Sequence, residues 1–370
     1  MSGKALLVAG GTGGHIYPAV ALARELSGRL GPGGVVFAVD KRPLASKVIS
    51  RLGYRIYTVT SAPLPRRAVW HICFFTVRML KGLIESLFLL YRVRPEVVVA
   101  FGAYTSVPVV AASYIMRIPV ILHEQNGFPG MANRFLSGFA SRIALSFDST
   151  LKYFPDYKTV VTGNPVREEL FKAERKEALR HFGLSPGKIT VLVFGGSLGS
   201  LEINMNMIGV LPYMEDYRER VQFIHVCGRK SYGKVSSGYS GAGFRARVFG
   251  YLDRMDLGYA AADIVVARAG ATTISELAAL GKPSILVPFP GATSHHQLLN
   301  AKPLSAAGGA VCFPEGFFSG EALAVRLIPL INDREKLKRM KEKLEPMGER
   351  FRSAASRLSD LVMEYIPSGG

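Results

Sequence analysis

The run 268–276 (Arg-Ala-Gly-Ala-Thr-Thr-Ile-Ser-Glu) has the residue types that binding of a phosphorylated ligand requires. It follows the apolar segment 263–267, which is typical of a buried strand, and it leads into a segment, 272–279, with the pattern of a helix. The small side chains of Gly270, Ala271 and Thr272 would let a diphosphate approach the backbone N–H groups at the helix start. Glu276, one turn further on, offers a carboxylate to a ribose diol. Taken alone, an ordinary strand–turn–helix with a surface glutamate fits the run equally well.

A second glycine-rich turn, 10–14, lies between an expected strand at 4–9 and a helix at 15–30. Strand, turn and helix resemble the start of a dinucleotide-binding unit, whose fingerprint is G-x-G-x-x-G. The fingerprint fails because Ile16 occupies the place of the third glycine. Asp40, which follows the second strand, is explained more simply as a polar residue at a strand end, so nicotinamide binding is disfavoured.

Four polar residues, His123 to Asn126, follow the apolar strand 119–122. Open α/β sheets bind ligands at the carboxyl ends of their strands, so this run is a candidate binding segment. The alternative is a polar turn that caps the next helix, 131–136.

The segment 63–95 combines bulky apolar side chains with cations, and Glu85 is its only acidic residue. Its apolar runs are too short to span a bilayer, but an aromatic helix fringed with cations can lie in the interface of an anionic membrane. Two helices packed on a sheet are the alternative. The predicted membrane contacts are Trp70, Phe74, Phe75, Arg66, Arg67, Arg78 and Lys81.

Composition sets outer limits on these hypotheses. A chain of 370 residues, 48% of them hydrophobic, is long enough for two globular domains. Its three cysteines are widely spaced and fit neither a disulfide framework nor a zinc site. We expect no signal peptide and no membrane-spanning segment. The net charge of +18 is uneven, because residues 1–163 contain 19 of the 46 Lys and Arg but only 7 of the 28 Asp and Glu. The first part of the chain therefore favours an anionic partner.

The order of the expected elements predicts two domains of similar design. Strand, glycine-rich loop and helix open the chain and recur at 188–211, after a turn at 163–165. The sequence thus predicts an α/β protein of two doubly wound, Rossmann-like domains facing a cleft. The expected ranges are 1–163, 164–345, and a C-terminal helix in 346–370 that packs back on the first domain.

Six motifs together resemble one family in their order and spacing. The family is that of MurG, the UDP-N-acetylglucosamine–N-acetylmuramyl-(pentapeptide) pyrophosphoryl-undecaprenol N-acetylglucosamine transferases of glycosyltransferase family 28. The motifs are Gly10–His15, His123–Asn126, Gly163–Arg167, Gly195–Ser197, Arg268–Glu276, and His296–Gln297 with Asn300–Ala301.

The resemblance implies a GT-B fold that binds the acceptor on the first domain and the donor mainly on the second. It implies inverting transfer of GlcNAc from UDP-GlcNAc to the C4 hydroxyl of MurNAc in lipid I, which gives lipid II. It also implies a peripheral enzyme on the cytoplasmic face of the inner membrane, with no cofactor and no metal. A relative that glycosylates a diacylglycerol is one alternative, and a basic nucleic-acid-binding protein is a weaker one, since the cations mix with bulky aliphatics.

The resemblance also assigns roles to individual residues. Ligand phosphates would meet Thr12, Gly13, Gly14, Arg167 and Ser197, while the sugar would meet Asn126 and either His296 or Gln297. Leu252 would contact the uracil through its backbone, and the run Ala271, Thr272, Thr273, Ile274, Ser275 and Glu276 would hold the diphosphate and ribose. His15 is the candidate general base, because imidazole titrates near neutrality, and Glu124 is the rival.

The chain departs from the family pattern at three places. Ala103 replaces a glycine in a turn assigned to the acceptor phosphates, and Leu198 replaces a glutamine. His296–Gln297 stands where some members have two glutamines.

Overall fold

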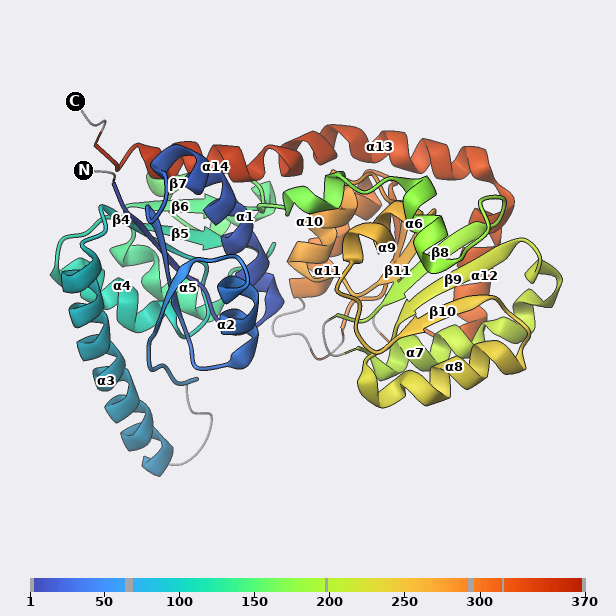
Figure 1. The fold of residues 1–370 in the computed structure, drawn as a ribbon, viewed down its shortest axis with the longest axis horizontal. Helices are drawn as coiled ribbons and strands as arrows, with labels where there is room; N and C mark the ends of the chain where they lie inside the picture. Colours follow the sequence, from blue (N-terminus) through green and yellow to red (C-terminus); the bar gives the residue numbers. More distant parts are fainter. Residues whose placement is uncertain are drawn as a thin grey trace. The chain divides into compact units, whose positions relative to one another are not determined.

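The computed structural model describes residues 3–63, 69–196, 199–289, 291, 296–314 and 316–367, and gives only the backbone of residues 69–71. The chain forms two compact units (Figure 1). Unit 1 contains Met1–Arg167 and Phe351–Gly370, and unit 2 contains Glu168–Arg350. The change of unit therefore lies between Arg167 and Glu168, four residues beyond the expected boundary at residue 163.

Unit 1 is built on a parallel sheet in the order β3-β2-β1-β4-β5-β6-β7. Its central strands are apolar throughout and buried on both faces, as parallel strands between helical layers must be. The strands are β1 (Ala5–Val8), β2 (Val35–Val39), β3 (Arg55–Thr58), β4 (Val97–Ala100), β5 (Val120–Glu124), β6 (Arg142–Leu145) and β7 (Thr159–Val161).

The helices of unit 1 cover its sheet. They are α1 (Gly13–Leu30), α2 (Pro43–Ser50), α3 (Val69–Val93), α4 (Ser106–Ile115), α5 (Met131–Leu136) and, from the end of the chain, α14 (Ala354–Met363). Leu358, Leu361 and Val362 of α14 belong to the same buried cluster as Leu22 and Leu26 of α1.

Unit 2 repeats the design with a parallel sheet in the order β10-β9-β8-β11-β12-β13. Its strands are β8 (Ile189–Phe194), β9 (Val221–Val226), β10 (Ala246–Phe249), β11 (Ile264–Ala267), β12 (Ser284–Leu286) and β13 (Ala310–Cys312). Its helices are α6 (Arg175–Phe182), α7 (Leu201–Gly209), α8 (Tyr232–Gly241), α9 (Met255–Ala261), α10 (Ala271–Ala279), α11 (His296–Ala306), α12 (Gly320–Asn332) and α13 (Arg334–Arg352), which continues into unit 1. The prediction of two doubly wound α/β domains is confirmed.

The helix of the repeat expected at 188–211 is α7, which begins at Leu201. The side chain of Ser200 caps the helix, because its Oγ accepts a hydrogen bond from the N–H of Ile203 at 3.4 Å. A serine N-cap satisfies one of the backbone donors that a helix start leaves unpaired.

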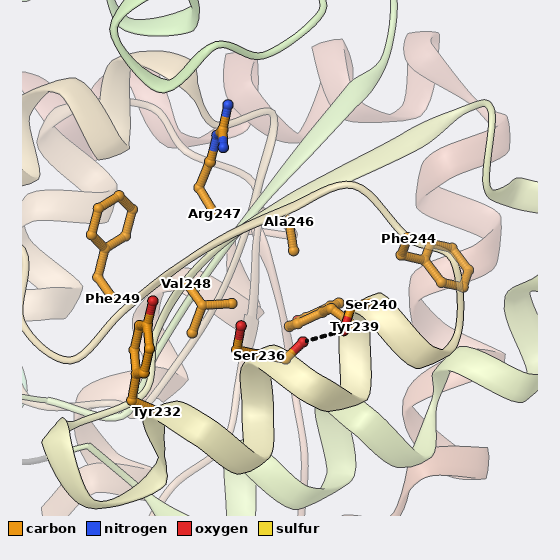
Figure 2. Close-up of a pocket in the computed structure, with 9 residues that line it drawn as sticks. All are labelled: Tyr232, Ser236, Tyr239, Ser240, Phe244, Ala246, Arg247, Val248 and Phe249. Atoms are coloured by element: carbon orange, nitrogen blue, oxygen red, sulfur yellow. Dashed lines mark hydrogen bonds between the residues drawn. The ribbon is translucent and has the colours of Figure 1, made fainter.

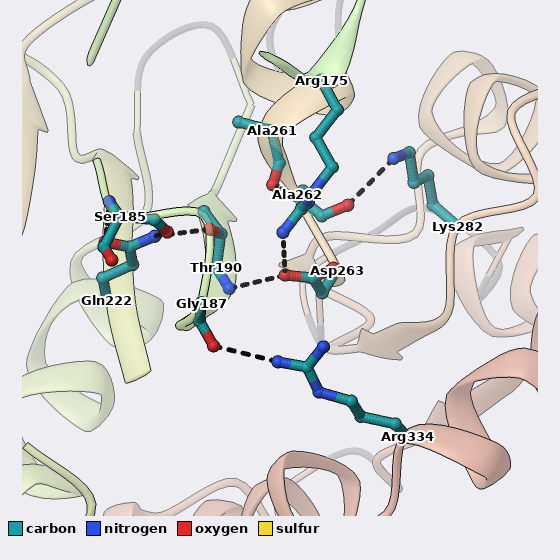
Figure 3. Close-up of polar contacts among 10 residues, drawn as sticks. All are labelled: Arg175, Ser185, Gly187, Thr190, Gln222, Ala261, Ala262, Asp263, Lys282 and Arg334. Carbon is teal, nitrogen blue, oxygen red and sulfur yellow. Dashed lines mark hydrogen bonds and ion pairs between the residues drawn. The ribbon is translucent and has the colours of Figure 1, made fainter. Parts of the chain in front are cut away.

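The amino ends of the unit 2 strands carry a polar network with a structural role (Figure 3). Asp263 accepts from the N–H of Thr190 at 2.8 Å and from Arg175 at 2.9 Å. Nearby, the buried amide of Gln222 binds both backbone groups of Ser185. These bonds join the starts of neighbouring strands, at the opposite edge from the glycine-rich loops.

Helix α3 is a single helix in the described residues, so the alternative of two helices in segment 63–95 is wrong. It lies beside α4, and its N-terminal half extends beyond the sheet (Figure 1). Glu85 fixes it to the sheet by accepting from the backbone N–H and the hydroxyl of Thr60, at 2.6 and 3.0 Å. Among the described residues, no helix is both long enough and apolar enough to cross a bilayer.

Candidate functional site

Each sheet reverses its strand order at one place, between β1 and β4 in unit 1 and between β8 and β11 in unit 2. Loops that leave neighbouring strands in opposite directions form a crevice at such a switch point, where doubly wound proteins bind ligands. The turns at 10–14, 102–105, 195–200 and 268–271 all follow these four strands. The sequence motifs therefore lie at the two positions that the topology favours for binding.

Asp40 shapes the first turn. Its Oδ2 accepts from the N–H of Gly11 at 2.9 Å and from the guanidinium of Arg42 at 2.6 Å. Gly11 has φ +86°, a conformation that favours glycine. These bonds lower the pKa of Asp40 although its burial opposes the shift. Asp40 is thus a structural support of the turn, which agrees with its interpretation as a polar strand-end residue.

His15 stands in the first turn of α1 and is partly exposed. Its Nδ1 lies 3.0 Å from Oε1 of Gln125, which follows β5. Burial lowers the pKa of His15, against the opposing effects of the Glu124 charge, the Gln125 hydrogen bond and the Phe101 carbonyl; the charge of Arg42 lowers it further. The imidazole is therefore neutral at pH 7, as a general base must be.

Glu124, the rival base, is buried and fully engaged. Its Oε1 accepts from the backbone N–H and the side chain of Asn126, at 2.9 and 3.2 Å. Its Oε2 accepts from the N–H of Gly130 at 2.9 Å and from the amide of Asn133 at 2.8 Å. Four donors on a buried carboxylate hold the loop before α5 in place, and these contacts favour His15 over Glu124 as the base. They also agree with the alternative in which the polar run supports the next helix.

In unit 2, Arg268 joins the loops that follow three strands. Its guanidinium donates to Ser200 Oγ at 2.9 Å and to Glu202 at 2.7 Å, and also to the carbonyls of Val287 and Pro288, each at 3.1 Å. The side chain is nearly buried and lies 5.3 Å from the Phe289 ring centroid. The arginine thus supports the loop around the predicted phosphate contacts.

The predicted diphosphate run begins helix α10, with Gly270 as its N-cap. Ile274 and Ser275 are fully buried, and Ser275 Oγ donates to Ala271 O inside the helix. Side-chain contacts of these two residues with a ligand are therefore disfavoured. Glu276 is also buried, at 6% exposure, and accepts from the Tyr259 hydroxyl at 2.8 Å.

The remaining predicted residues are distributed over both units. Thr12 is the exposed N-cap of α1, followed by Gly13 and Gly14. Arg167 lies in unit 1, not in the second domain as expected, with its guanidinium carbon 4.3 Å from the Tyr17 ring centroid.

On the side of unit 2, Leu252 is buried in the loop after β10. His296 is the first residue of α11, and Gln297 Oε1 accepts from the N–H of Phe289 at 3.0 Å. Ser197, Arg66 and Arg67 lie outside the described residues, as does the side chain of Trp70.

The structure adds two residues to which the sequence assigned no role. Gln125 was part of a recognised motif but had no function of its own, and Tyr259 had no sequence signal at all. Tyr259 is fully buried in α9, with an apolar environment typical of a core aromatic. Only the position of Glu276 in space shows that the tyrosine contacts a predicted ligand-binding residue.

A hollow of about 310 Å³ lies elsewhere in unit 2, between α8 and the edge strand β10 (Figure 2). None of its lining residues is a predicted site residue. Its position on an edge strand, away from the switch point between β8 and β11, separates it from the predicted donor site.

Comparisons with known proteins identify the relatives of the chain. The sequence model of the "Glycosyltransferase family 28 N-terminal domain" matches residues 5–145, and that of the "Glycosyltransferase family 28 C-terminal domain" matches residues 190–358. A curated relative from Halothermothrix orenii is 37% identical over 355 residues, covering 94% of this chain and 95% of the relative. One from Myxococcus xanthus is 37% identical over 363 residues, covering 98% and 93%. Both are named "UDP-N-acetylglucosamine--N-acetylmuramyl-(pentapeptide) pyrophosphoryl-undecaprenol N-acetylglucosamine transferase".

The solved structures agree with this relationship. The crystal structure of Acinetobacter baumannii MurG matches with a TM-score of 0.74 and 25% sequence identity, covering 98% of this chain and 99% of that one. The two Rossmann-like units are those of a GT-B glycosyltransferase. The chain belongs to glycosyltransferase family 28.

Proposed function

We propose that this protein transfers GlcNAc from UDP-GlcNAc to the C4 hydroxyl of MurNAc in lipid I, giving lipid II for peptidoglycan synthesis. The observation that carries the proposal is the relationship, over nearly the whole chain, to transferases whose names state this donor group and this acceptor. The supporting geometry is a neutral, partly exposed imidazole at one switch point and a helix start with a buried glutamate at the other.

The reaction requires one proton transfer and one displacement. His15 Nε2 takes the proton of the acceptor hydroxyl while the oxygen of that hydroxyl attacks the anomeric carbon of GlcNAc. The bond from that carbon to the UDP oxygen breaks, and its electron pair leaves with the diphosphate, so the configuration inverts. The growing negative charge is stabilised by helix N-termini and by an arginine.

For the donor, we assign the diphosphate to the start of α10 and to Ser197, and the ribose diol to Glu276. The backbone at Leu252 would meet the uracil, and His296 or Gln297 the sugar hydroxyls. Backbone N–H groups at a helix start suit an anion, and the first bond inside α10 runs from Ile274 N to Gly270 O, at 2.9 Å.

In unit 1, we assign the donor or acceptor phosphates to the turn Thr12, Gly13 and Gly14, and the diphosphate of UDP-GlcNAc to Arg167. Asn126 would meet the sugar. Its backbone is fixed on both sides, since its N–H donates to Glu124 and its carbonyl accepts from Thr150 at 3.1 Å. A fixed backbone holds the amide in a constant place for recognition.

The reaction is tested by release of UDP from the full-length protein. We expect release only when UDP-GlcNAc and a lipid I analogue are both present, with much slower turnover of UDP-Glc or UDP-Gal. A diacylglycerol in place of the lipid I analogue serves as the second acceptor arm. Transfer to the diacylglycerol alone would replace this proposal by the glycolipid alternative.

We further propose that α3 places the protein on an anionic membrane surface, at the cytoplasmic face of the inner membrane. One face of the helix is apolar and exposed: Phe74 is 61% exposed, Val77 65% and Phe88 71%, and Leu80, Ile84 and Tyr91 continue the same face. Arg78 lies beside this face, 4.8 Å from the Phe74 ring centroid, and Lys81 is exposed as well. An exposed apolar stripe with cations next to it fits the interface of anionic lipids.

Flotation with liposomes tests the membrane assignment. The wild-type protein should float with vesicles of phosphatidylglycerol and remain behind with neutral ones. Phe74→Ser combined with Phe88→Ser should weaken binding on the order of 10²-fold, given the apolar area of the two rings.

The matched control for this substitution is Phe317→Ser, since Phe317 is also 71% exposed but lies in unit 2. Replacing Trp70, Phe74 and Phe75 by Ser extends the test to the predicted aromatic cluster. Equal flotation of all variants would reject the membrane role of α3.

A further inference from the structure

The side-chain amide of Gln125 has only one possible orientation. Its nitrogen lies 3.0 Å from the carbonyl oxygen of Phe101 and 3.1 Å from that of His123. Backbone carbonyls only accept, so the atom that faces them must be the NH₂ group. The amide oxygen therefore faces His15, 3.0 Å from its Nδ1.

A buried histidine supports the same orientation independently. His123 Nε2 lies 3.1 Å from the carbonyl oxygen of Gly163, so Nε2 carries the hydrogen. His123 is neutral, because burial lowers its pKa to about 4. Its Nδ1 is then an acceptor, and it faces the Gln125 nitrogen at 3.0 Å. The hydrogen bond with His123 therefore also requires that the amide nitrogen of Gln125 face His123.

We propose that Gln125 is a positioning residue that fixes the tautomer of His15, with His123 and Gly163 holding Gln125 in turn. An amide oxygen accepts, so His15 Nδ1 must carry the hydrogen, and the lone pair of the neutral ring is on Nε2. Gln125 thereby selects which nitrogen of His15 can take up a proton. The tautomer itself stands on the contacts described; its use in catalysis rests on the proposed transfer reaction.

The inference is tested by long-range ¹H–¹⁵N correlation spectra of the histidine rings in the full-length protein. The signals of His15 are identified by their absence in His15→Gln. In the wild type we expect the pattern of a ring protonated on Nδ1 at pH 7.5. A His15 ring protonated on Nε2 would overturn the proposal without any assay of activity.

Two variants of Gln125 separate positioning from a structural role. Gln125→Leu removes the acceptor, so His15 should become a mixture of tautomers, and kcat should fall on the order of 10²-fold with KM little changed. Gln125→Glu keeps an acceptor oxygen at Nδ1 but replaces the NH₂ group that faces the carbonyls of Phe101 and His123, so His15 should keep its tautomer while the protein loses stability. Where the new carboxyl group ionises, His15 should titrate at higher pH. The acid limb of the kcat/KM profile should move to higher pH with it.

The titration must be attributed with the other charged groups near His15 in view. Glu124 on β5 and Arg42 before α2 act on the same ring in opposite directions, and neither is changed in these variants. A shift of the acid limb in Gln125→Glu thus reports the new carboxylate.

Gln222→Leu is the matched control, because Gln222 is an equally buried glutamine of unit 2 whose oxygen and nitrogen bind Ser185 (Figure 3). It should lower stability while leaving the His15 signals unchanged. An unchanged His15 tautomer in folded Gln125→Leu would overturn the proposal, and if that variant fails to fold, the wild-type spectra decide, since they must show His15 protonated on Nδ1. The expected tautomer in a protein without transferase activity would instead contradict the proposed function alone.

Discussion

Both units bury a histidine in a strand, and the hydrogen-bonded networks around these two histidines end in different places. His123 on β5 connects through Gln125 to His15, which is partly exposed in the first turn of α1. His225 on β9 donates from Nε2 to Asn204 Oδ1 at 3.0 Å and lies 3.1 Å from the hydroxyl of Tyr239, which is fully buried. The hydrogen bonds of the first network lead from the core to the carboxyl ends of the strands, while those of the second network stay inside the core.

This difference separates a reactive network from a structural one. A buried chain of polar groups specifies a unique core wherever it occurs, because each unpaired member would be costly. Chemistry requires in addition that the last member can reach a substrate. Unit 1 meets that condition at His15, and unit 2 does not meet it at Tyr239.

The largest expected effect comes from replacing a histidine by glutamine in each of the two hydrogen-bonded networks. His15→Gln should lower kcat by about 10²- to 10⁴-fold, because it removes the proposed base, and should leave the free energy of unfolding nearly unchanged. His225→Gln should cost about 1–3 kcal/mol of stability, because it disrupts buried hydrogen bonds, with kcat of the folded protein retained. Steady-state kinetics and urea unfolding measure the two effects, and UDP binding serves as the control for folding. If His225→Gln lost turnover as His15→Gln does, the comparison would be wrong.

The two buried glutamates extend the comparison. Glu276→Ala should raise the Kd for UDP roughly 10- to 100-fold, because it removes hydrogen bonds to a charged group. Glu124→Ala should leave UDP affinity unchanged but cost about 3 kcal/mol of stability, because the donors of Asn126, Gly130 and Asn133 lose their acceptor. Calorimetric titration with UDP and denaturant unfolding distinguish the two. Unchanged UDP affinity in Glu276→Ala would contradict the ribose assignment.

Mild acid should weaken both units by similar amounts. The pKa of His123 is lowered to about 4 and that of His225 to about 3, in each case first by burial. An unfolded chain takes up these protons near pH 6.5, so stability is lost as the pH falls below that value and continues to fall until the folded pKa is reached. Each histidine should cost about 2 kcal/mol at pH 5 relative to pH 7.5.

Hydrogen exchange followed by mass spectrometry reads the two units separately, through peptides of β5 and β9. His225→Gln should reduce the pH dependence of the opening free energy of β9 and leave that of β5 unchanged. His181→Gln, on the exposed face of α6, should alter neither. If the opening free energy of β5, corrected for the intrinsic pH dependence of amide exchange, did not change between pH 7.5 and 5, a neutral buried His123 would be contradicted.

Much of the fold follows from local sequence. The helix 131–136 has the predicted bounds, and the strands expected at 4–9 and 263–267 agree with β1 and β11 to within one residue, since each is a continuous apolar or periodic run with clear limits. The strand β3, with the sequence Arg-Ile-Tyr-Thr, was missed because it lies at the sheet edge and is half exposed, so it lacks an apolar run. Edge strands give the weakest signal of this kind.

The site was predictable in place but not in detail. The rule that ligands bind at the carboxyl ends of strands selects 10–15, 123–126 and 268–276 as candidates, and the structure places these runs at or beyond the carboxyl ends of β1, β5 and β11. The hydrogen bond between His15 and Gln125 joins residues that are 110 positions apart, and no local pattern indicates it. Glu124 shows the same limit of sequence-based prediction. A carboxylate in this motif suggested a general base, but the four hydrogen bonds that it accepts indicate that it holds the loop in place.

The return of the chain to unit 1 has a consequence for biogenesis. Helix α14 supplies Leu358, Leu361 and Val362 to the core that surrounds α1, and Asp360 pairs with Arg29 at 2.6 Å. During synthesis, most of the unit that carries His15 is made before unit 2, yet its core is not complete until residues 354–363 have emerged as well. Unit 2 is complete earlier and can fold while α1 still exposes apolar surface. The ribosome therefore completes the unit with the proposed donor site before it has made the last part of the core that supports the proposed base.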